Sequence, residues 1–406
     1  MARAGKYPAL LFAVLVLGLG ARVRADSSEP ANSSAAVEAT SAKQPSQFWL
    51  WSEPRQMGRW LDGKGITGNV TLINDWSKNF RGGSSSAGSL DRYSLDVSAT
   101  LDDKKAFGWN GGTEFIRLKH HLGESGGDYV GDAQGFSNID DVPRSHLYEL
   151  WFEQKLLTDR LRFKLGKIDA NTEFALVQSA GDFLNSSMGF SPTILALPTY
   201  PEPQLGLNVF VRPKQHYQIS VGLFRTAGDG EMLIVEGGRD WRLGDRELGG
   251  RSSFGVWRLT GPVACFDGTH LAGAQGFYMV AEQSIWSRKR PEPAGEEKLS
   301  AFLQYGHANA EVSRFTHHLG GGIVLESPFA ARPHDAIGIG ATSGRFTDDP
   351  DAGFEENAEL AVELYYKISV KRHISLLPDL QFIHNPGGLR SQQDAVVLTP
   401  RLSISF

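Results

Sequence analysis

The chain alternates apolar and polar side chains with a period of two from about residue 66 to its last residue. In 204–212 the apolar positions are every second one, Leu205, Leu207, Val209 and Val211. Successive side chains of a β-strand point to opposite faces, so each such segment is a strand with one apolar and one polar face. Phe210 breaks the pattern, because it shares the polar face with Gln204, Asn208 and Arg212.

About sixteen such segments follow one another, and this repetition predicts an all-β protein. No helical period separates them, which favours antiparallel hairpins over alternating strand and helix units. We expect the strands near residues 68–76, 89–101, 112–121, 145–155, 160–168, 204–212, 216–226, 232–242, 252–260, 275–287, 298–307, 318–326, 334–346, 357–370, 373–384 and 394–406.

Two architectures fit this pattern. A soluble sandwich buries its apolar faces, whereas a transmembrane antiparallel β-barrel turns them toward lipid and encloses a polar lumen. Three features favour the barrel: a secretory signal, charge crowded on the polar faces, and a long chain without a domain break. The alternative is a secreted soluble β-protein that binds carbohydrate.

The N-terminus reads as a secretory signal peptide, residues 1–25. Arg3 and Lys6 precede an apolar stretch from Ala9 to Gly20, which is too short to cross a membrane, and small residues follow near Ala25. Residues 26–47 are small and polar and predict a flexible leader. Residues 48–65 predict a short periplasmic helical segment ended by glycines, and residues 66–406 the barrel.

Composition excludes several other classes of protein. The net charge of −5 gives no electrostatic reason to expect a nucleic-acid partner. The single cysteine, Cys265, allows no internal disulfide. No later segment reaches about 18 consecutive apolar residues, so we expect no membrane-spanning helix.

The polar faces of neighbouring strands carry both signs of charge together with a tryptophan. The side chains concerned are Arg117 and Lys119 in 112–121, Glu149, Trp151, Glu153 and Lys155 in 145–155, and Arg160, Arg162 and Lys164 in 160–168. This mixture fits a water-filled constriction. It also fits an exposed sheet face with ordinary cross-strand ion pairs.

The last segment, 394–406, is a strand that a barrel would pair with the first strand, since a barrel has no edges. Pro378 and Pro400 fit poorly, because each removes a ladder donor from an expected strand. Both prolines fall on the face of their strand that would contact lipid, and we expect a local bulge at these positions.

Several phrases resemble the carbohydrate-selective porin family (OprB-type) of Gram-negative outer membranes. They are DYVGDAQGFSNID (128–140), LYELWFEQKLLTDRLRFKLGKIDANTEFA (147–175), GDFLNSSMGFSPT (181–193) and PDLQFIHNPGG (378–388). The resemblance spans roughly residues 60–406. The stretch SEPRQMGRWLDGKGI departs from the family, because it keeps only the latter part of the phrase that usually precedes the barrel.

The resemblance implies a porin with a single barrel of sixteen strands in the outer membrane, in contact with lipid, that passes mono- or oligosaccharides by diffusion. Sugars and small ions would share this path, so ion transport is expected too. It implies no enzyme activity and no cofactor, and it leaves open whether the barrels form a homo-trimer.

A sugar offers hydroxyls to charged side chains and an apolar face to an aromatic ring. We therefore expect the sugar-binding constriction to comprise Arg117, Glu149, Trp151, Glu153, Arg162 and Lys164. The alternative for each is a structural ion pair in the lumen. The segment 169–203 is long enough to fold into the lumen, or it could cap the surface.

Catalytic and metal sites are not expected. Glu149 and Glu153 on one strand lie ~13 Å apart, beyond the ~5–9.5 Å between glycosidase carboxyl groups. A pair of carboxylates on neighbouring strands stays open as an alternative. Asp128, Asp132, Asp140 and Asp141 could hold calcium in a loop, but their spacing misses the EF-hand pattern.

Overall fold

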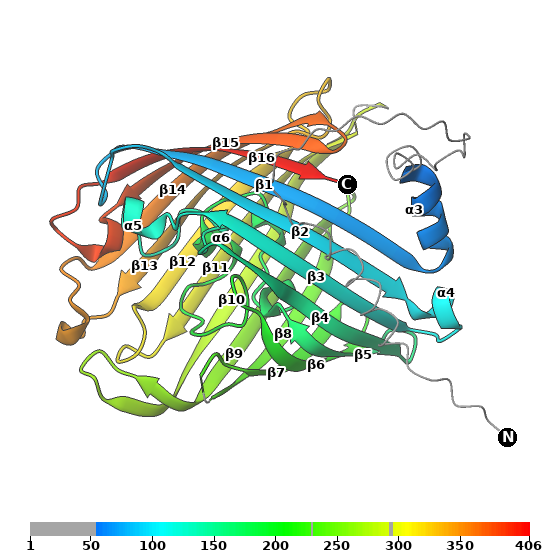
Figure 1. Cartoon of the computed structure of the whole chain (residues 1–406), viewed down its shortest axis with the longest axis horizontal. Coiled ribbons are helices and arrows are strands. Elements are labelled where there is room, and N and C mark those ends of the chain that lie inside the picture. Colours follow the sequence, from blue (N-terminus) through cyan, green and yellow to red (C-terminus); the bar gives the residue numbers. More distant parts are fainter. Residues whose placement is uncertain (1–53, 229, 292–294) are drawn as a thin grey trace, which may run out of the picture. The chain divides into compact units, whose positions relative to one another are not determined.

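The computed structural model describes residues 54–228, 230–291 and 295–406 (Figure 1). The proposed signal peptide and leader lie outside the described residues. The first described element is helix α3, Pro54–Gly63, and strand β1 begins at Ile66. Gly65 makes this turn at φ +80°, where a side chain would be strained and a Cβ would lie 2.7 Å from the backbone oxygen of Asp102. The expected short helix before the barrel is confirmed.

Sixteen antiparallel strands form one closed barrel in which each strand pairs with its sequence neighbours and β1 pairs with β16. All sixteen expected segments are strands. They are β1 (Ile66–Arg81), β2 (Leu90–Asp102), β3 (Gly112–Gly123), β4 (Arg144–Leu156), β5 (Leu161–Ile168), β6 (Gln204–Lys214), β7 (Tyr217–Arg225), β8 (Glu231–Leu243), β9 (Leu248–Ala264), β10 (His270–Lys289), β11 (Glu296–Ala308), β12 (Phe315–Glu326), β13 (Ala336–Phe346), β14 (Ala358–Lys371), β15 (Ile374–His384) and β16 (Ala395–Ser405).

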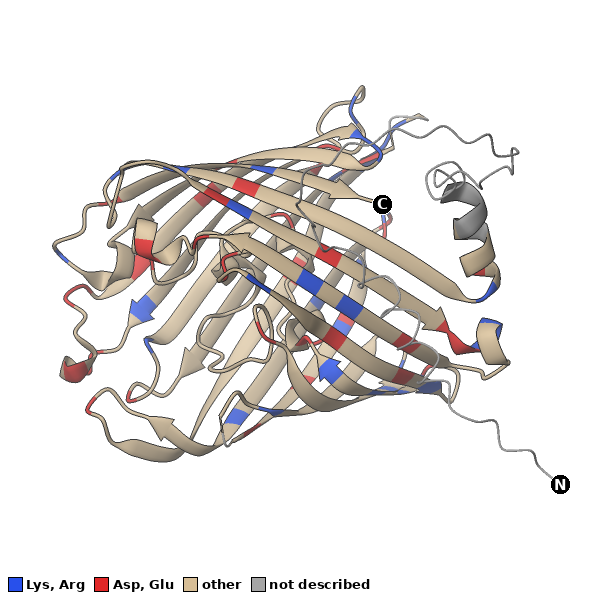
Figure 2. Cartoon of the chain, in the orientation of Figure 1, with Lys and Arg blue, Asp and Glu red and all other residues tan. Residues whose placement is uncertain are grey.

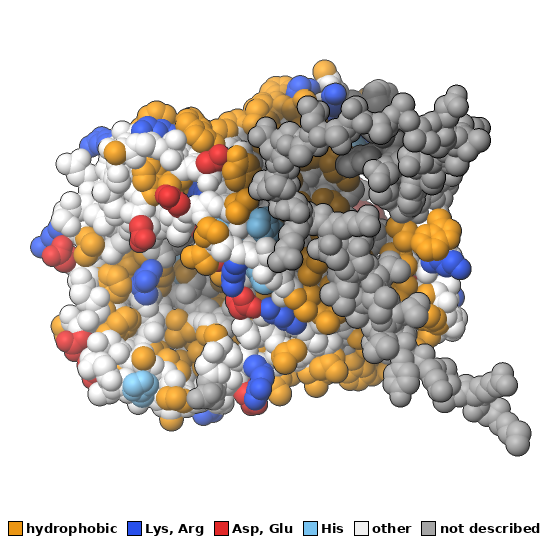
Figure 3. Space-filling view, viewed as in Figure 1, with side chains coloured by type: hydrophobic (Ala, Val, Ile, Leu, Met, Phe, Trp, Pro, Cys, Tyr) orange, Lys and Arg blue, Asp and Glu red, His pale blue; other side chains and the backbone are white. Residues whose placement is uncertain are grey.

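The two faces of the strands differ as a membrane barrel requires. On β6, Leu205 and Leu207 are exposed on the outer wall, whereas Asn208 and Phe210 on the other face are buried inside. The same parity holds along β7, where Ile219 and Leu223 are exposed and Ser220 is buried. Figure 3 shows hydrophobic side chains spread over the visible outer wall. None of the described helices is long and apolar enough to cross a membrane.

The two ends of the barrel carry connections of different length. At the end where β1 begins and β16 finishes, the connections are short, such as residues 215–216 and 372–373. The opposite end carries the two longest, loop L2 (residues 124–143) and loop L3 (residues 169–203). Outer-membrane barrels have short periplasmic turns and long outer loops, so the short-turn end is the periplasmic one.

The seam between the first and last strands is closed by a buried ion pair as well as by the backbone. Asp75 on β1 and Arg401 on β16 are opposite each other in the register. The guanidinium of Arg401 donates to both carboxylate oxygens of Asp75 at 2.7 and 2.8 Å. The side chain of Asp75 is fully buried and that of Arg401 is 10% exposed. Close by, the hydroxyls of Ser77 and Thr399 are 2.8 Å apart.

Pro378 and Pro400 lie in the strands without a bulge beside them, so the prediction of a local bulge is wrong. Pro378 and Pro400 face each other in an unbroken β15–β16 register. The interruptions fall on the far sides, where the β14–β15 pairing skips from Asp379 to Leu376 and the β1–β16 pairing from Arg401 to Leu398. The position of each missing N–H therefore points away from the other proline. The β14–β15 pairing and the β1–β16 pairing each lack one backbone hydrogen bond at a proline, and the β15–β16 pairing lacks none there.

The remaining described helices are short and lie in the connections. They are α4 (Asp103–Phe107), α5 (Gly127–Val130), η1 (Ala170–Thr172), η2 (Gln178–Ala180), α6 (Ser186–Gly189), η3 (Pro350–Ala352) and η4 (Pro386–Gly388). Three of them, η1, η2 and α6, belong to L3. Their caps hold L3 in a defined shape: the side chains of Asp169 and Asn185 accept hydrogen bonds from the backbone N–H groups of Asn171 and Ser187.

Candidate functional site

Loop L3 folds into the barrel and is hydrogen-bonded to the far wall, so of the two expected placements the lumen is correct. Its backbone N–H groups donate to three lumen carboxylates, Glu236 on β8, Glu282 on β10 and Glu363 on β14. From β11, the amide of Gln304 donates to two L3 carbonyl oxygens, each at 2.8 Å. These contacts reach almost around the barrel, so L3 divides the lumen.

An apolar core lies between L3 and one side of the wall. Phe174 of L3 stacks on Phe210 of β6 with ring centroids 6.0 Å apart and meets Phe224 of β7 edge-on. Further along L3, Phe183 packs against Phe302 and Tyr365. This part of the lumen is filled. It also explains why Phe210 departs from the polar face of its strand: it faces a loop and not water.

The first part of the candidate constriction is an ion-pair cluster on β4, β5 and L3. The guanidinium of Arg162 donates to Glu153 at 2.8 Å and to both carboxylate oxygens of Glu173 at 3.0 and 2.7 Å. Lys164 donates to the same Glu173 at 2.5 Å. The guanidinium carbon of Arg162 also lies 3.6 Å from the ring centre of Phe210. Glu173, from L3, thus fixes two cations of the wall.

The second part continues the cluster toward β3. Arg117 pairs with Glu149 at 3.2 Å, and the indole N–H of Trp151 donates to Glu149 at 3.2 Å. The ring of Trp151 stacks on Phe115 with centroids 4.9 Å apart, and the Nζ atom of Lys164 lies 4.0 Å from its centre. Because β3 and β5 flank β4 on opposite sides, both neighbours cover the indole.

All six sequence-predicted residues are therefore brought together, on adjacent strands and on the lumen face. Contacts run without a break through Arg117, Glu149, Trp151, Lys164, Glu173, Arg162 and Glu153. Figure 2 shows charged positions gathered across β2 to β5. The prediction missed Glu173, which joins the two halves of the cluster. It missed it because no strand periodicity assigns a face to a loop residue.

Open space lies beside this cluster, between L3 and the wall from β5 to β9. A hollow of about 620 Å³ is lined by both signs of charge, including Arg162, Glu173, Arg212, Glu236 and Arg251. A second hollow of about 330 Å³ shares Arg162 and Arg212 with the first. Arg162 is thus placed where the two hollows meet. Arg212 was predicted on the polar face of its strand but not among the site residues.

The charge state of Glu173 follows from its partners. Burial in the lumen opposes its ionisation and would raise its pKa, but the hydrogen bonds from Arg162 and the charge of Lys164 outweigh burial. The net result is a pKa below the usual value of 4.5. Glu173 is therefore an anion at neutral pH, and the cluster keeps both signs of charge.

Loop L2 is also anchored inside the barrel, and two of its four aspartates form ion pairs. Asp140 pairs with Arg92 of β2, and Asp141 pairs with Arg144 at 2.7 Å. Within the described ranges, no three His, Cys, Asp or Glu side chains are grouped to hold a metal ion. The calcium hypothesis for this loop thus finds no support in the geometry.

Comparison with known proteins gives the family. The family model described as "Carbohydrate-selective porin, OprB family" matches residues 86–230 and 226–406. Porin B of Pseudomonas aeruginosa is 22% identical over 98% of this chain and 96% of its own length. The putative porin QuiX of Acinetobacter baylyi is 22% identical over 88% of this chain and 94% of its own length.

A solved structure shares the fold. The high-pH structure of OprB from Pseudomonas putida matches with a TM-score of 0.78 at 19% identity, covering 91% of this chain and all of that one. The family is one of channels rather than enzymes. Together with a closed sixteen-stranded barrel, the match over most of the sequence leads to one assignment. The chain belongs to the OprB family of carbohydrate-selective porins of the Gram-negative outer membrane.

Proposed function

We propose that mono- or oligosaccharides cross this barrel through the passage between L3 and the wall from β5 to β9, and that the charged cluster forms its selective constriction. The observation that carries this proposal is the position of Arg162. It lines both lumen hollows, and Glu153 and Glu173 hold it in place from β4 and from L3. A fixed guanidinium at the junction of two hollows meets every solute that uses them.

The chemistry of the passage suits a neutral polyol. Sugar hydroxyls both donate and accept, so arginine N–H groups and carboxylate oxygens can each bond to them. Cations and anions line the same hollow, so a neutral polyol meets both kinds of partner there. A channel site must also release its solute, and partners already engaged with each other bind a sugar only weakly.

The six predicted residues take different roles in this proposal. Arg162 and Glu153 border the hollows and would contact the sugar directly. Trp151 is covered by Phe115 and Lys164, so its ring would position Lys164 rather than stack on a sugar. Glu149 would hold Trp151 by accepting a hydrogen bond from its indole N–H, and Arg117 would hold Glu149 through their ion pair.

Arg162→Ala tests the proposal in planar bilayers. We expect the sugar concentration that halves the ion current to rise about fivefold, because one hydrogen bond to the sugar contributes about 1 kcal/mol net. Arg144→Ala is the matched control, since Arg144 also pairs with two acids, Asp141 and Glu202, but does not line these hollows. An unchanged half-block in Arg162→Ala, or equal shifts in both variants, would remove Arg162 from the path.

Trp151→Phe and Trp151→Ala separate positioning from sugar stacking. A phenyl ring still packs on Phe115 and under Lys164, so Trp151→Phe should keep the sugar selectivity of liposome swelling within about twofold. Trp151→Ala frees Lys164 and widens the lumen, so larger sugars should enter relatively faster. Trp76→Ala, on the outer wall where Trp76 is 44% exposed, should change neither. A large selectivity loss in Trp151→Phe would instead favour direct stacking.

A further inference from the structure

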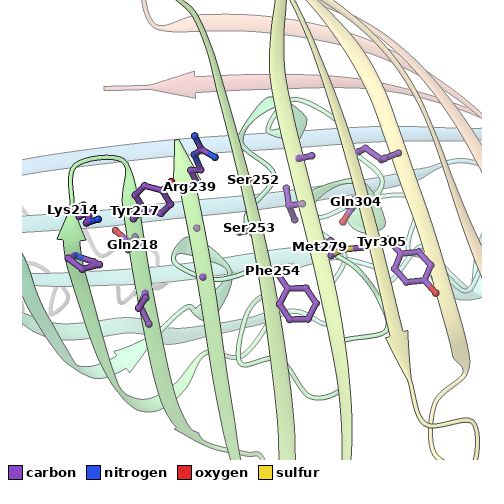
Figure 4. A pocket seen from close by; sticks show the side chains of 17 residues that line it. Lys214, Tyr217, Gln218, Arg239, Ser252, Ser253, Phe254, Met279, Gln304 and Tyr305 are labelled. Carbon is purple, nitrogen blue, oxygen red and sulfur yellow. The ribbon is translucent and has the colours of Figure 1, made fainter. Parts of the chain in front are cut away.

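The outer wall carries a separate hollow, which shares residues of its short-turn rim, Lys214 and Arg239 among them, with the lumen hollow. The outer hollow has a volume of about 790 Å³, within the range of small-molecule pockets, and it crosses the strands from the end of β6 to β11. Its outward-facing rim is apolar and exposed, with Ile219, Phe254, Met279 and Leu303 between 45% and 55% exposed. Figure 4 shows Phe254, Met279 and Tyr305 on successive strands across it.

Small residues on adjacent strands form the floor of the hollow. Gly237 lies in the register between Ile219 and Phe254, and a Cβ added to it would meet nothing within 4 Å. In the next row toward the short-turn end, Ser252 is paired with Ala281. Large side chains around small ones leave a depression in the wall.

Two cations stand at the short-turn end of the same hollow. Lys214 and Arg239 both line it and both are exposed, and they lie beside Tyr217 at the end of the β6–β7 hairpin (Figure 4). The guanidinium carbon of Arg239 is 5.4 Å from the ring centre of Tyr217. In the part of the chain that the structure describes, neither cation forms a salt bridge with an acidic side chain.

We propose that this groove binds one anionic phospholipid of the periplasmic leaflet, with an acyl chain over Gly237 and its phosphate on Lys214 and Arg239. Charge complementarity identifies the occupant. The cations are at the short-turn end, at the depth of the inner-leaflet phosphates, and a cation facing lipid is favourable where it meets an anionic headgroup.

Native mass spectrometry of the purified, delipidated porin tests this. The probes are phosphatidylglycerol and phosphatidylcholine with identical chains. We expect one phosphatidylglycerol to bind at least fivefold more tightly than phosphatidylcholine. Lys214→Gln/Arg239→Gln should abolish that preference. Gly237→Leu, which fills the floor without removing charge, should weaken binding of both lipids.

Arg225→Gln is the matched control, because Arg225 is an exposed arginine at the opposite end of β7 and does not line the groove. It should retain the preference of the native chain. Equal binding of the two lipids by the native chain would overturn the proposal, as would an unchanged preference in the double variant. Loss of a dimer or trimer in Gly237→Leu, without loss of lipid, would assign the groove to a contact between barrels and overturn it too. If inorganic phosphate displaced phosphatidylglycerol completely, the groove would be a general anion site and the lipid proposal would be wrong.

Discussion

Glu173→Gln is expected to raise the anion-over-cation permeability ratio of the channel at least about tenfold. Glu173 is the L3 carboxylate that holds Arg162 and Lys164, and glutamine keeps its shape while removing its charge. Arg162, which lines the passage, then keeps only Glu153 as an anionic partner, and Lys164 loses the anion that it shared with Arg162. An anion ~5 Å from one such cation gains about 3 kcal/mol at an effective dielectric constant of ~20, before screening by salt. Reversal potentials in a salt gradient measure the ratio.

Glu202→Gln is a control of the same kind on the same loop. Glu202 also binds one arginine and one lysine, Arg144 and Lys167, but its side chain is 40% exposed and does not line the passage. Its substitution should leave the ratio within about twofold of the native value. If the two variants gave equal ratios, Glu173 would not set the charge of the constriction.

Acidification should reproduce the effect of Glu173→Gln. The pKa of Glu173 is lowered in the folded protein, so its ion pairs are complete above the ordinary value of 4.5 and are lost as the pH falls through the lowered one. The native channel should therefore become more anion-selective as the pH falls through this lowered pKa, below 4.5, and Glu173→Gln should lose that part of the change.

The barrel was predictable from sequence because lipid and lumen impose opposite demands on alternate residues. Leu205 and Leu207 must contact hydrocarbon and Asn208 must not, so a period of two runs along most of the length of the strands. The segments between the predicted strands are then the turns and loops. The closing pair of β1 with β16 was predictable for the same reason, since an unpaired edge cannot exist in lipid.

The lumen was less predictable, because L3 occupies it and loops have no period. Phe210 looked like an exception within a strand and is explained only by Phe174. Glu173 lies in a phrase that carried the family resemblance, yet its partners became clear only from the fold. Trp151 was placed correctly on the lumen face, but sequence could not show that Phe115 and Lys164 would cover it.

The buried Asp75–Arg401 pair gives the second large effect. Arg401→Leu should destabilise the barrel by about 3–5 kcal/mol, because it leaves the carboxylate of Asp75 at 0% exposure without its cation. Asn138 of L2 also loses a partner, since Arg401 donates to its side-chain oxygen at 2.8 Å. Urea unfolding in lipid vesicles, followed by the heat-dependent gel shift of folded barrels, measures the loss.

Arg345→Leu provides the comparison. Arg345 also pairs with an aspartate, Asp348 at 3.0 Å, but the two side chains are 56% and 76% exposed. An exposed pair contributes about 0–1 kcal/mol, so this variant should unfold close to the native midpoint. The contrast isolates burial from the mere presence of an ion pair.

The stability of the double variant Asp75→Leu/Arg401→Leu shows whether the ion pair itself stabilises the barrel or whether only an unpaired buried charge destabilises it. Removing both charges leaves neither Asp75 nor Arg401 as a buried ion without its partner, and replacing a buried pair by apolar side chains is often neutral. The double variant should therefore be more stable than Arg401→Leu, although the hydroxyl of Ser137 loses its bond to Asp75. If it is instead as unstable as the single variant, the pair itself holds β1 against β16. If Arg401→Leu keeps native stability, the seam depends on the backbone ladder and the Ser77–Thr399 contact alone.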